Sequence, residues 1–294
     1  MRRIYKIHER GSACHTFNNC YMRKIVLQLL FLIFCPVLFA QDLVILYTND
    51  VHSNIEPAAS GENAGIGGYQ RIANYVDHVR ADHKNVLLLD AGDYNQGTPY
   101  YTLFKGEVEV KIMNALKYDA ATIGNHEFDD GQHALAERLK YANYQTLCSN
   151  YDFSKSPLDG MVKPYIVIEK GGKRIGIIGA TLNIDGVVSA SGRKDLVYKP
   201  PIPIVNKLAK RLKRKESCDL VILLSHLGYS EGSQARPGDI LVAKKSKDID
   251  IIIGGHTHTY LATPTIVPNS TGSPVIVTQA GSSGVNVGRL DITF

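Results

Sequence analysis

Residues 43–52 read LVILYTNDVH, a run of five apolar or aromatic residues followed by a polar segment that carries Asp50 and His52. A short, continuous apolar run of this kind is typical of a β-strand that is buried on both faces of its sheet. In an extended segment, side chains two residues apart point to the same side. The stretch therefore predicts a buried strand that ends in a carboxylate and an imidazole aimed in one direction.

The same kind of apolar run recurs along the chain. Further runs of strand length lie at 86–89, 120–123, 174–178, 220–224, 250–253 and 275–278. Between them, apolar residues recur at helical spacing over 72–79 and 205–212. Strands that alternate with helices predict an α/β fold, and we expect residues 41–294 to form a single domain.

One pair of runs indicates an antiparallel connection. The runs 163–170 and 173–180 flank Gly171-Gly172, a combination that is typical of a β-hairpin. A hairpin cannot belong to a purely parallel sheet. We therefore expect the sheet to be mixed.

Polar side chains of one chemical kind follow five of these strands. They are Asp50 with His52, then Asp93, then Asn125 with His126, then His226, and finally His256 with His258. Ligands bind at the carboxyl ends of strands in open α/β sheets, so these side chains are expected to converge. A single histidine after a strand is usually structural, but five such ends in one chain point to a shared site. Carboxylate, imidazole and amide ligands suit divalent Mn, Zn, Fe or Mg.

The order of these motifs resembles that of a known family. D-x-H, G-D, G-N-H-E, S-H and G-H-x-H follow one another at 50–52, 92–93, 124–127, 225–226 and 255–258. Together they are similar to the calcineurin-like metallophosphoesterase superfamily. The stretches 87–93, 96–99 and 125–129 are similar in detail to its 5′-nucleotidase branch. The resemblance implies a mixed-sheet, four-layer α/β sandwich with its metal site at the carboxyl ends of the strands.

The resemblance also implies a role for each residue. Two divalent ions would be bound, the first by Asp50, His52 and His258, the second by Asn125, His226 and His256, with Asp93 as the bridge. His126, together with Asn125, would contact the substrate phosphate, and Asp129 would orient the His126 imidazole. Asp129 also precedes a helical pattern at 131–140, so a helix N-cap is the alternative role for that residue.

The implied function is hydrolysis of a small phosphate ester. The resemblance favours phosphate monoesters, and 5′-nucleotides in particular, with a metal-activated hydroxide as the nucleophile. A cyclic-nucleotide or broad-specificity phosphodiesterase is the alternative, because the same two-metal core hydrolyses both kinds of ester. A non-catalytic binding module is disfavoured because every expected ligand position is filled.

The resemblance extends to a part that this sequence is expected to lack. Members of the 5′-nucleotidase branch carry a second, C-terminal domain that recognises the nucleoside. This chain stops at Phe294, just after the last expected core strand. We therefore expect the nucleotide-binding domain to be absent here and to be encoded as a separate polypeptide.

The first forty residues are expected to form a leader. They contain six basic residues and one acidic residue, which accounts for the whole formal net charge of +5. Met22-Arg23-Lys24 is a short basic start, the run 25–39 is apolar, and Ala40 suits cleavage. This pattern predicts a signal peptide, a true start at Met22, and an exported, periplasmic or secreted protein. A retained membrane anchor is the alternative.

The charge balance also bears on partners. Because residues 41–294 are neutral overall, no broad basic field favours a nucleic-acid partner. One local feature is strongly basic. The polar face of the segment 205–214 carries Lys207, Lys210, Arg211, Lys213 and Arg214. Such a stripe indicates a solvated helix face, with a binding patch as the alternative.

Two cysteines remain outside the leader. Cys148 and Cys218 each adjoin an apolar run, so we expect buried free thiols. A single bridge between them is the alternative.

Overall fold

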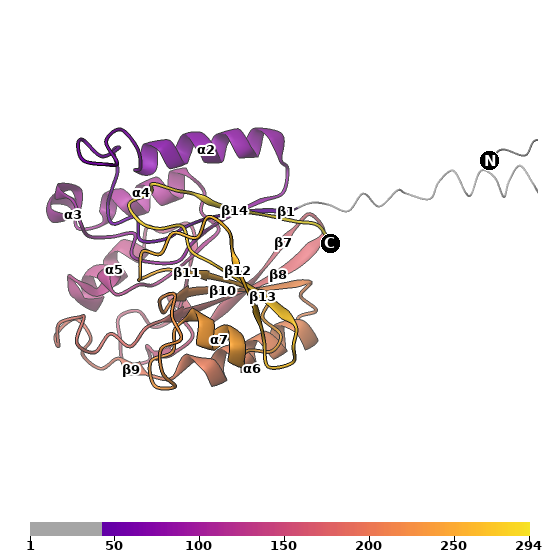
Figure 1. The fold of residues 1–294 in the computed structure, drawn as a ribbon. Helices are drawn as coiled ribbons and strands as arrows, with labels where there is room; N and C mark the ends of the chain where they lie inside the picture. Colours follow the sequence, from indigo (N-terminus) through magenta and orange to yellow (C-terminus); the bar gives the residue numbers. More distant parts are fainter. Residues whose placement is uncertain (1–42) are drawn as a thin grey trace, which may run out of the picture. The chain divides into compact units, whose positions relative to one another are not determined.

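The computed structural model describes residues 43–294, which form the compact unit drawn in colour in Figure 1. The predicted leader over residues 1–40 lies outside the described residues. Within residues 43–294, no helix is both long enough and apolar enough to cross a membrane.

One six-stranded sheet contains the N-terminal strands. Its order is β14-β1-β2-β3-β4-β6. The strands β1 to β6 of this sheet run parallel, and β14 pairs antiparallel with β1 at the edge. The bounds are β1 Leu43–Thr48, β2 Val86–Asp90, β3 Ala120–Thr122, β4 Gln145–Leu147, β6 Val162–Lys163 and β14 Gly288–Ile292.

A second six-stranded sheet has the order β12-β13-β11-β10-β8-β7. Its four central strands are parallel, and β12 and β7 are antiparallel edges. The bounds are β7 Tyr165–Lys170, β8 Lys173–Thr181, β10 Leu220–His226, β11 Ile251–Gly254, β12 Thr265–Pro268 and β13 Pro274–Thr278. A short antiparallel pair, β5 Tyr151–Asp152 with β9 Val197–Tyr198, lies outside both sheets.

The predicted hairpin is confirmed as β7 and β8. Lys170 pairs with Lys173, and the two residues between them, Gly171 and Gly172, have φ angles of 61° and 71°. Left-handed backbone at both central positions is what a tight two-residue turn requires, and glycine adopts it without strain.

The two sheets pack face to face and share one apolar layer. Leu43, Ile45 and Leu87 of the first sheet lie in the same buried cluster as Ile177 and Ile222 of the second. These residues alternate along their strands with others that face outward. The continuous apolar runs of the sequence are explained by this burial on both faces.

Helices cover the two outer faces, as Figure 1 shows. The first sheet is covered by α2 (Tyr69–Asp82) and α4 (Glu107–Ala115), and the second by α6 (Pro201–Arg214) and α7 (Asp239–Lys245). The expected four-layer α/β sandwich is therefore confirmed. The remaining helices, α3 (Pro99–Phe104), the 3₁₀ turn η1 (His126–Phe128) and α5 (Gly131–Leu139), belong to connections that follow β2 and β3.

The two sheets agree with the expected four-layer sandwich and show how the predicted strands pair, which the apolar runs left open. The seven predicted apolar strands and the hairpin strand at 163–170 are all present, and they are divided between the two sheets. The strands whose ends carry the candidate ligands are split as well, with β1, β2 and β3 in the first sheet and β10 and β11 in the second. An apolar run shows that a strand is buried on both faces, but it does not show which strands pair with it.

Both cysteines of the described chain are buried and unpaired. The expectation of free thiols is confirmed. The Cys148 thiol lies 3.4 Å from the Thr181 hydroxyl, and burial raises the pKa of Cys148 to about 11. This thiol is therefore protonated and unreactive at neutral pH.

The two sheets approach each other closely where β8 passes β4. A Cβ atom at Gly179 would lie 2.5 Å from the carbonyl carbon and oxygen of Leu147. Ser149 also donates to the Gly179 carbonyl, from its backbone N at 2.8 Å and from its hydroxyl at 2.7 Å. Backbone meets backbone here, so the position admits only a residue without a side chain.

We predict that Gly179→Ala destabilises the fold. The added methyl group meets main-chain atoms that cannot rotate away, and overpacking of this kind costs about 1–3 kcal/mol. Thermal unfolding followed by circular dichroism should show a melting temperature lowered by about 2–4 °C per kcal/mol. An unchanged melting temperature would mean that β8 and β4 can move apart enough to accommodate the methyl group.

Candidate metal centre

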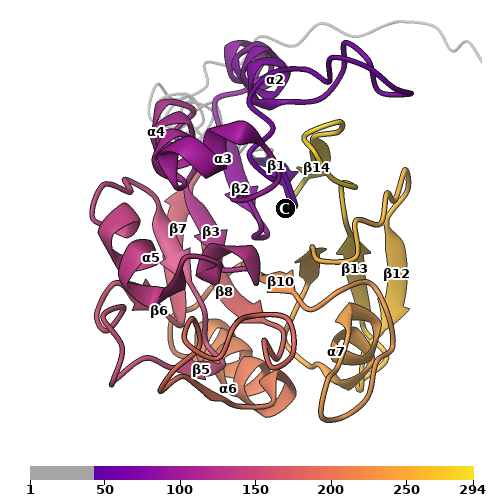
Figure 2. The same ribbon diagram turned by 90° about the vertical axis from the view of Figure 1, so that its left-hand side faces the viewer.

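Five strand ends bring the predicted site residues together. Asp50 and His52 follow β1, Asp93 follows β2, Asn125 and His126 follow β3, His226 ends β10, and His256 and His258 follow β11. Among the carboxylates and histidines of this set, ligand atoms fall into three groups of three, each within 4.8 Å. In the view of Figure 2, the loops that carry these residues face the reader.

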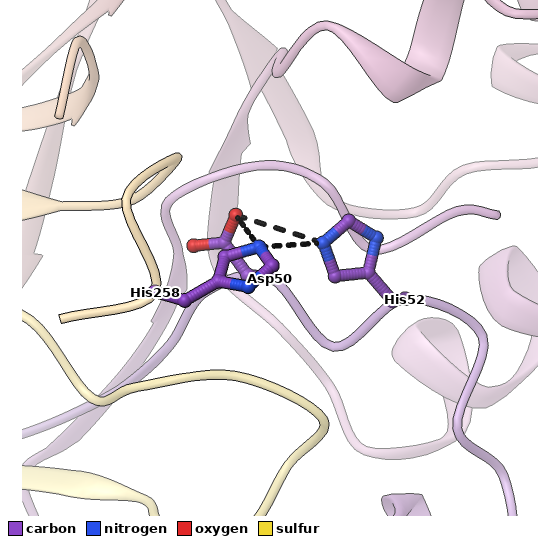
Figure 3. Close-up of side chains that lie close together, drawn as sticks. All are labelled: Asp50, His52 and His258. Carbon is purple, nitrogen blue, oxygen red and sulfur yellow. Dashed lines mark hydrogen bonds and ion pairs between the residues drawn. The ribbon is translucent and has the colours of Figure 1, made fainter. Parts of the chain in front are cut away.

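The first group consists of Asp50, His52 and His258 (Figure 3). His52 Nε2 lies 2.9 Å from His258 Nε2, and the two nitrogens lie 3.8 and 3.4 Å from Asp50 Oδ1. Figure 3 shows both rings turned toward the same carboxylate oxygen. Two imidazole nitrogens this close repel each other unless a proton or a cation lies between them.

The second group consists of Asp93, His226 and His256, with Asn125 beside it. His226 Nε2 lies 3.0 Å from Asp93 Oδ2, and His256 Nδ1 lies 3.1 Å from Asn125 Oδ1. His226 is fully buried and donates from Nδ1 to the Ala91 carbonyl at 2.7 Å. In the neutral ring this bond leaves the lone pair on Nε2, which is the form that binds a metal.

The third group joins the other two and contains His126. It consists of His52, Asp93 and His126, and the rings of His52 and His126 meet edge to face at 5.2 Å. Sequence reasoning placed His126 outside the ligand set. The structure brings the residue to ligand distance, but its Nδ1 is engaged elsewhere, 2.7 Å from Asp129 Oδ2.

His126 and Asp129 form a pair at the rim of the site. The hydrogen bond to Asp129 raises the pKa of His126, and burial opposes that rise. Asp129 does not cap the following helix, because the N-cap position of α5 is Asp130, which makes no side-chain capping bond. Of the two roles considered for Asp129, the observed contact is the one with the imidazole.

The donor set fits divalent cations in its electrostatics. Burial lowers the pKa of His226, yet the Asp93 carboxylate raises it to about 10. The carboxylate therefore stabilises a positive charge at this position. Buried His226 Nε2 also has no hydrogen-bond partner among the described residues, although Asp93 Oδ2 lies 3.0 Å away. Burial lowers the pKa of His52 and of His256, which keeps these rings neutral and able to bind metal.

The backbone of the site is strained in a consistent way. Five of the seven candidate ligands have positive φ angles: Asp50 50°, His52 51°, Asp93 55°, His256 76° and His258 54°. Residues other than glycine adopt this left-handed conformation rarely, and such residues gather at functional sites. The left-handed backbone is therefore an indication of a functional site that is separate from the chemical nature of the side chains.

Comparison with known proteins agrees with this geometry. The model of the calcineurin-like phosphoesterase family matches residues 43–260.

The chain belongs to the calcineurin-like phosphoesterases.

Within this family of hydrolases, the chain is similar to 5′-nucleotidases. It is 37% identical to the snake venom 5′-nucleotidase of Crotalus adamanteus over 86% of this chain and 45% of that protein, and 35% identical to the human 5′-nucleotidase over 88% and 48%. Among solved structures, the Thermus thermophilus 5′-nucleotidase precursor is 36% identical, with a TM-score of 0.78 over 86% of this chain and 51% of that one. The Haemophilus influenzae NAD nucleotidase is 32% identical, with a TM-score of 0.76 over 86% and 53%. The chain thus spans about half the length of these relatives.

Two residues that support the phosphoesterase site were not identified from the sequence. Asn49 donates from Nδ2 to Asp50 Oδ2 at 2.6 Å and to the Gly281 carbonyl at 2.7 Å, and its Oδ1 accepts from Ala280 N. It therefore fixes the Asp50 carboxylate against the segment after β13. The only signal in the sequence was its position beside a candidate ligand.

Glu127 is the second supporting residue. Its Oε2 accepts from Asp93 N at 3.0 Å and from Gly124 N at 2.6 Å, and its Oε1 accepts from Asn95 N at 3.2 Å. One fully buried carboxylate thus ties the loop after β2 to the loop after β3. The last letter of G-N-H-E marked the residue, but nothing in that letter showed which amides it would bind.

We predict that Glu127→Gln loosens both loops. An amide cannot replace a carboxylate that accepts three N–H bonds, and leaving buried donors unpaired costs about 1–3 kcal/mol. Thermal unfolding and binding of Mn²⁺ or Zn²⁺, measured by competition with a chelator, should both weaken. Glu137→Gln is the matched control, since Glu137 is an exposed residue of α5 whose carboxylate pairs with Lys140. Equal behaviour of the two variants would contradict the bracing role.

Proposed function

We propose that this phosphoesterase hydrolyses phosphate monoesters with the help of two divalent metal ions, and that 5′-nucleotides are its substrates. The observation that carries the proposal is the position of Asp93. Its carboxylate belongs to one group of ligand atoms with His226 and His256 and to another with His52 and His126. A carboxylate shared in this way suits a bridge between two ions.

We assign the ligands as follows: Asp50, His52 and His258 to one ion, Asn125, His226 and His256 to the other, and Asp93 to both. Nitrogen and oxygen donors of this kind suit Mn, Zn, Fe or Mg. When bound, two such ions lower the pKa of water to about 7 and neutralise charge on the phosphoryl oxygens.

The chain's own groups act on the substrate from the rim. The His126–Asp129 hydrogen bond leaves Nε2 of His126 free on the side away from Asp129. Because that bond raises the pKa of His126, the ring can carry a proton and hand it to the leaving oxygen, or stabilise charge on the phosphoryl group. Asn125 directs Oδ1 toward His256, and its Nδ2 would donate to a phosphoryl oxygen.

Substrate, partner and location are parts of the same proposal. The relatives named 5′-nucleotidases support nucleotides as substrates. Because the chain spans about half the length of those relatives, their nucleotidase activity is part of the proposal and not a property shown for this chain. The venom and precursor relatives, together with the predicted signal over residues 1–40, support export to the periplasm or the medium. An uncleaved leader would anchor the chain in the membrane.

The test is a substrate panel on the purified chain supplied with Mn²⁺ or Zn²⁺. Turnover of AMP and of an aryl phosphate, with little turnover of a cyclic nucleotide or a bis-aryl phosphate, is the expected result. Faster turnover of the diesters would replace the proposal by a phosphodiesterase. No turnover of any ester, with two metal ions bound, would favour the binding module.

We predict that Asp93→Ala removes more metal than any other single ligand change. A carboxylate that touches both ions holds two positive charges together, so its loss weakens both sites. Elemental analysis after dialysis should give about two equivalents of metal per wild-type chain and much less than one per variant. Asp82→Ala, at an exposed aspartate of α2, is the control and should keep both. Full metal content and turnover in Asp93→Ala would refute the bridge.

We predict that His126→Ala keeps its metal and loses turnover. Removal of a proton donor or of a group that stabilises the transition state costs about two to four orders of magnitude in kcat. Metal content and kcat measured on the same preparations separate the two roles. If metal is lost in proportion to activity, His126 belongs to the ligand set, as its place in the third group would allow.

A further inference from the structure

A groove of about 730 Å³ lies at the end of the second sheet opposite the metal centre. It is formed by α6, the segment between α7 and β11, and the turn between β12 and β13. Asp250 and Pro274, which line it, lie at the amino ends of β11 and β13. The candidate metal ligands follow the carboxyl ends, so the groove takes no part in the proposed hydrolysis.

The structure divides the basic stripe of α6 into two sets. Arg211 and Lys213 are neutralised: Arg211 Nε lies 3.3 Å from Glu216 Oε1, and Lys213 Nζ lies 2.7 Å from Asp250 Oδ2. Lys207, Lys210 and Arg214 are exposed, and within residues 43–294 none of them has a carboxylate partner. Their spacing of three and four residues puts them on one face of the helix.

All three unpaired residues of α6 line the groove, and a fourth cation faces them. Lys247, from the segment after α7, lines the same groove and has no ion pair among the described residues. The carboxylates there are Asp250, which is neutralised by Lys213, and Asp248. Four free cations against one free carboxylate leave a strongly positive concave surface, where the field is stronger than over a convex one.

Neutral donors complete the lining. Asn269, Thr271 and Ser273 come from the turn between β12 and β13. The Oδ1 atom of Asn269 accepts from Thr271 N at 2.9 Å and from Ser273 N at 3.0 Å, which leaves its Nδ2 as the donor for a ligand. Amide, hydroxyl and ammonium donors in one cavity match the oxygens of a phosphate-bearing anion.

We propose that this groove, defined by Lys207, Lys210, Arg214, Lys247 and Asn269, is a binding site for a small anion that carries more than one phosphate charge. A single helix face would suit any diffuse anionic surface, but the groove adds cations and donors from two further segments that surround a discrete ligand. Such a ligand is either a free oligophosphate or a phosphate-bearing headgroup of a lipid. Both present the same chemistry to the groove.

The test compares the wild-type holoenzyme with Lys207→Glu/Lys210→Glu and with the control Lys84→Glu/Lys215→Glu. The control changes charge equally at exposed lysines outside the groove. Calorimetry with tripolyphosphate and flotation with vesicles rich in phosphatidylglycerol form the two arms. We expect the groove variant to bind at least tenfold more weakly in one or both arms, the control to match wild type, and kcat on an aryl phosphate to stay equal in all three.

The arms identify the source of the ligand. Groove-dependent loss with tripolyphosphate assigns a free oligophosphate, and loss confined to the vesicles assigns a headgroup. Equal binding by all three proteins, or equal weakening in both variants, would overturn the proposal, because the cations would then act only through their total charge. Competition of tripolyphosphate with the aryl phosphate, to the same extent in all proteins, would place the anion at the metal centre and overturn it as well. Groove-dependent binding of a short oligonucleotide tighter than that of tripolyphosphate would replace the small anion by a nucleic acid.

Discussion

The contact between Asp93 and His226 is the constraint on which the rest of the site depends. Asp93 follows a strand of the first sheet and His226 ends a strand of the second, yet their side chains lie 3.0 Å apart and both are buried. A buried carboxylate is tolerated only when a positive charge lies beside it, whether that charge comes from a protonated His226 or from a bound cation, so this contact limits how the ends of the two sheets can meet. When the ends of the two sheets are packed in this way, the positions of the loops after β1, β3 and β11, and of the candidate ligands on them, are constrained.

The fold maintains this arrangement against backbone strain. Left-handed backbone at residues other than glycine costs about 1–3 kcal/mol each, and five candidate ligands adopt it. The opposing contributions are local and specific. Glu127 satisfies three amides of two loops, Asn49 holds the Asp50 carboxylate, and Gly255 lets the backbone pass where a Cβ atom would lie 2.7 Å from His226 Nδ1. The site is therefore built by its supporting residues as much as by its ligands.

The sequence predicted the strands and the candidate ligands because both depend on local pattern. A continuous apolar run reports burial on two faces, and a polar residue directly after it must lie at the strand end, wherever that strand sits in the fold. The division into two sheets was implied by the resemblance to a four-layer sandwich and not by the apolar runs, since pairing depends on contacts between distant segments. Edge strands such as β14 were missed because their residues alternate between partly buried and exposed and leave no apolar run. The role of Glu127 was also hidden, because backbone amides of other loops have no signature in the sequence.

The parallel strands of the second sheet also explain how one compact unit can hold both the candidate metal centre and the proposed anion groove. Because these strands are parallel, the carboxyl ends of β8, β10, β11 and β13 lie together at one end of the sheet, and their amino ends lie at the opposite end. At the carboxyl ends, His226, His256 and His258 lie beside the carboxylates that follow strands of the first sheet, which suits cations. At the amino ends of the strands, α6 ends beside the start of β11. The unpaired lysines of α6 line the groove there, which suits anions. The two ends of the sheet are separated by the length of the strands, at about 3.3 Å per residue. A ligand can therefore bind in the groove without changing the charges at the candidate metal centre.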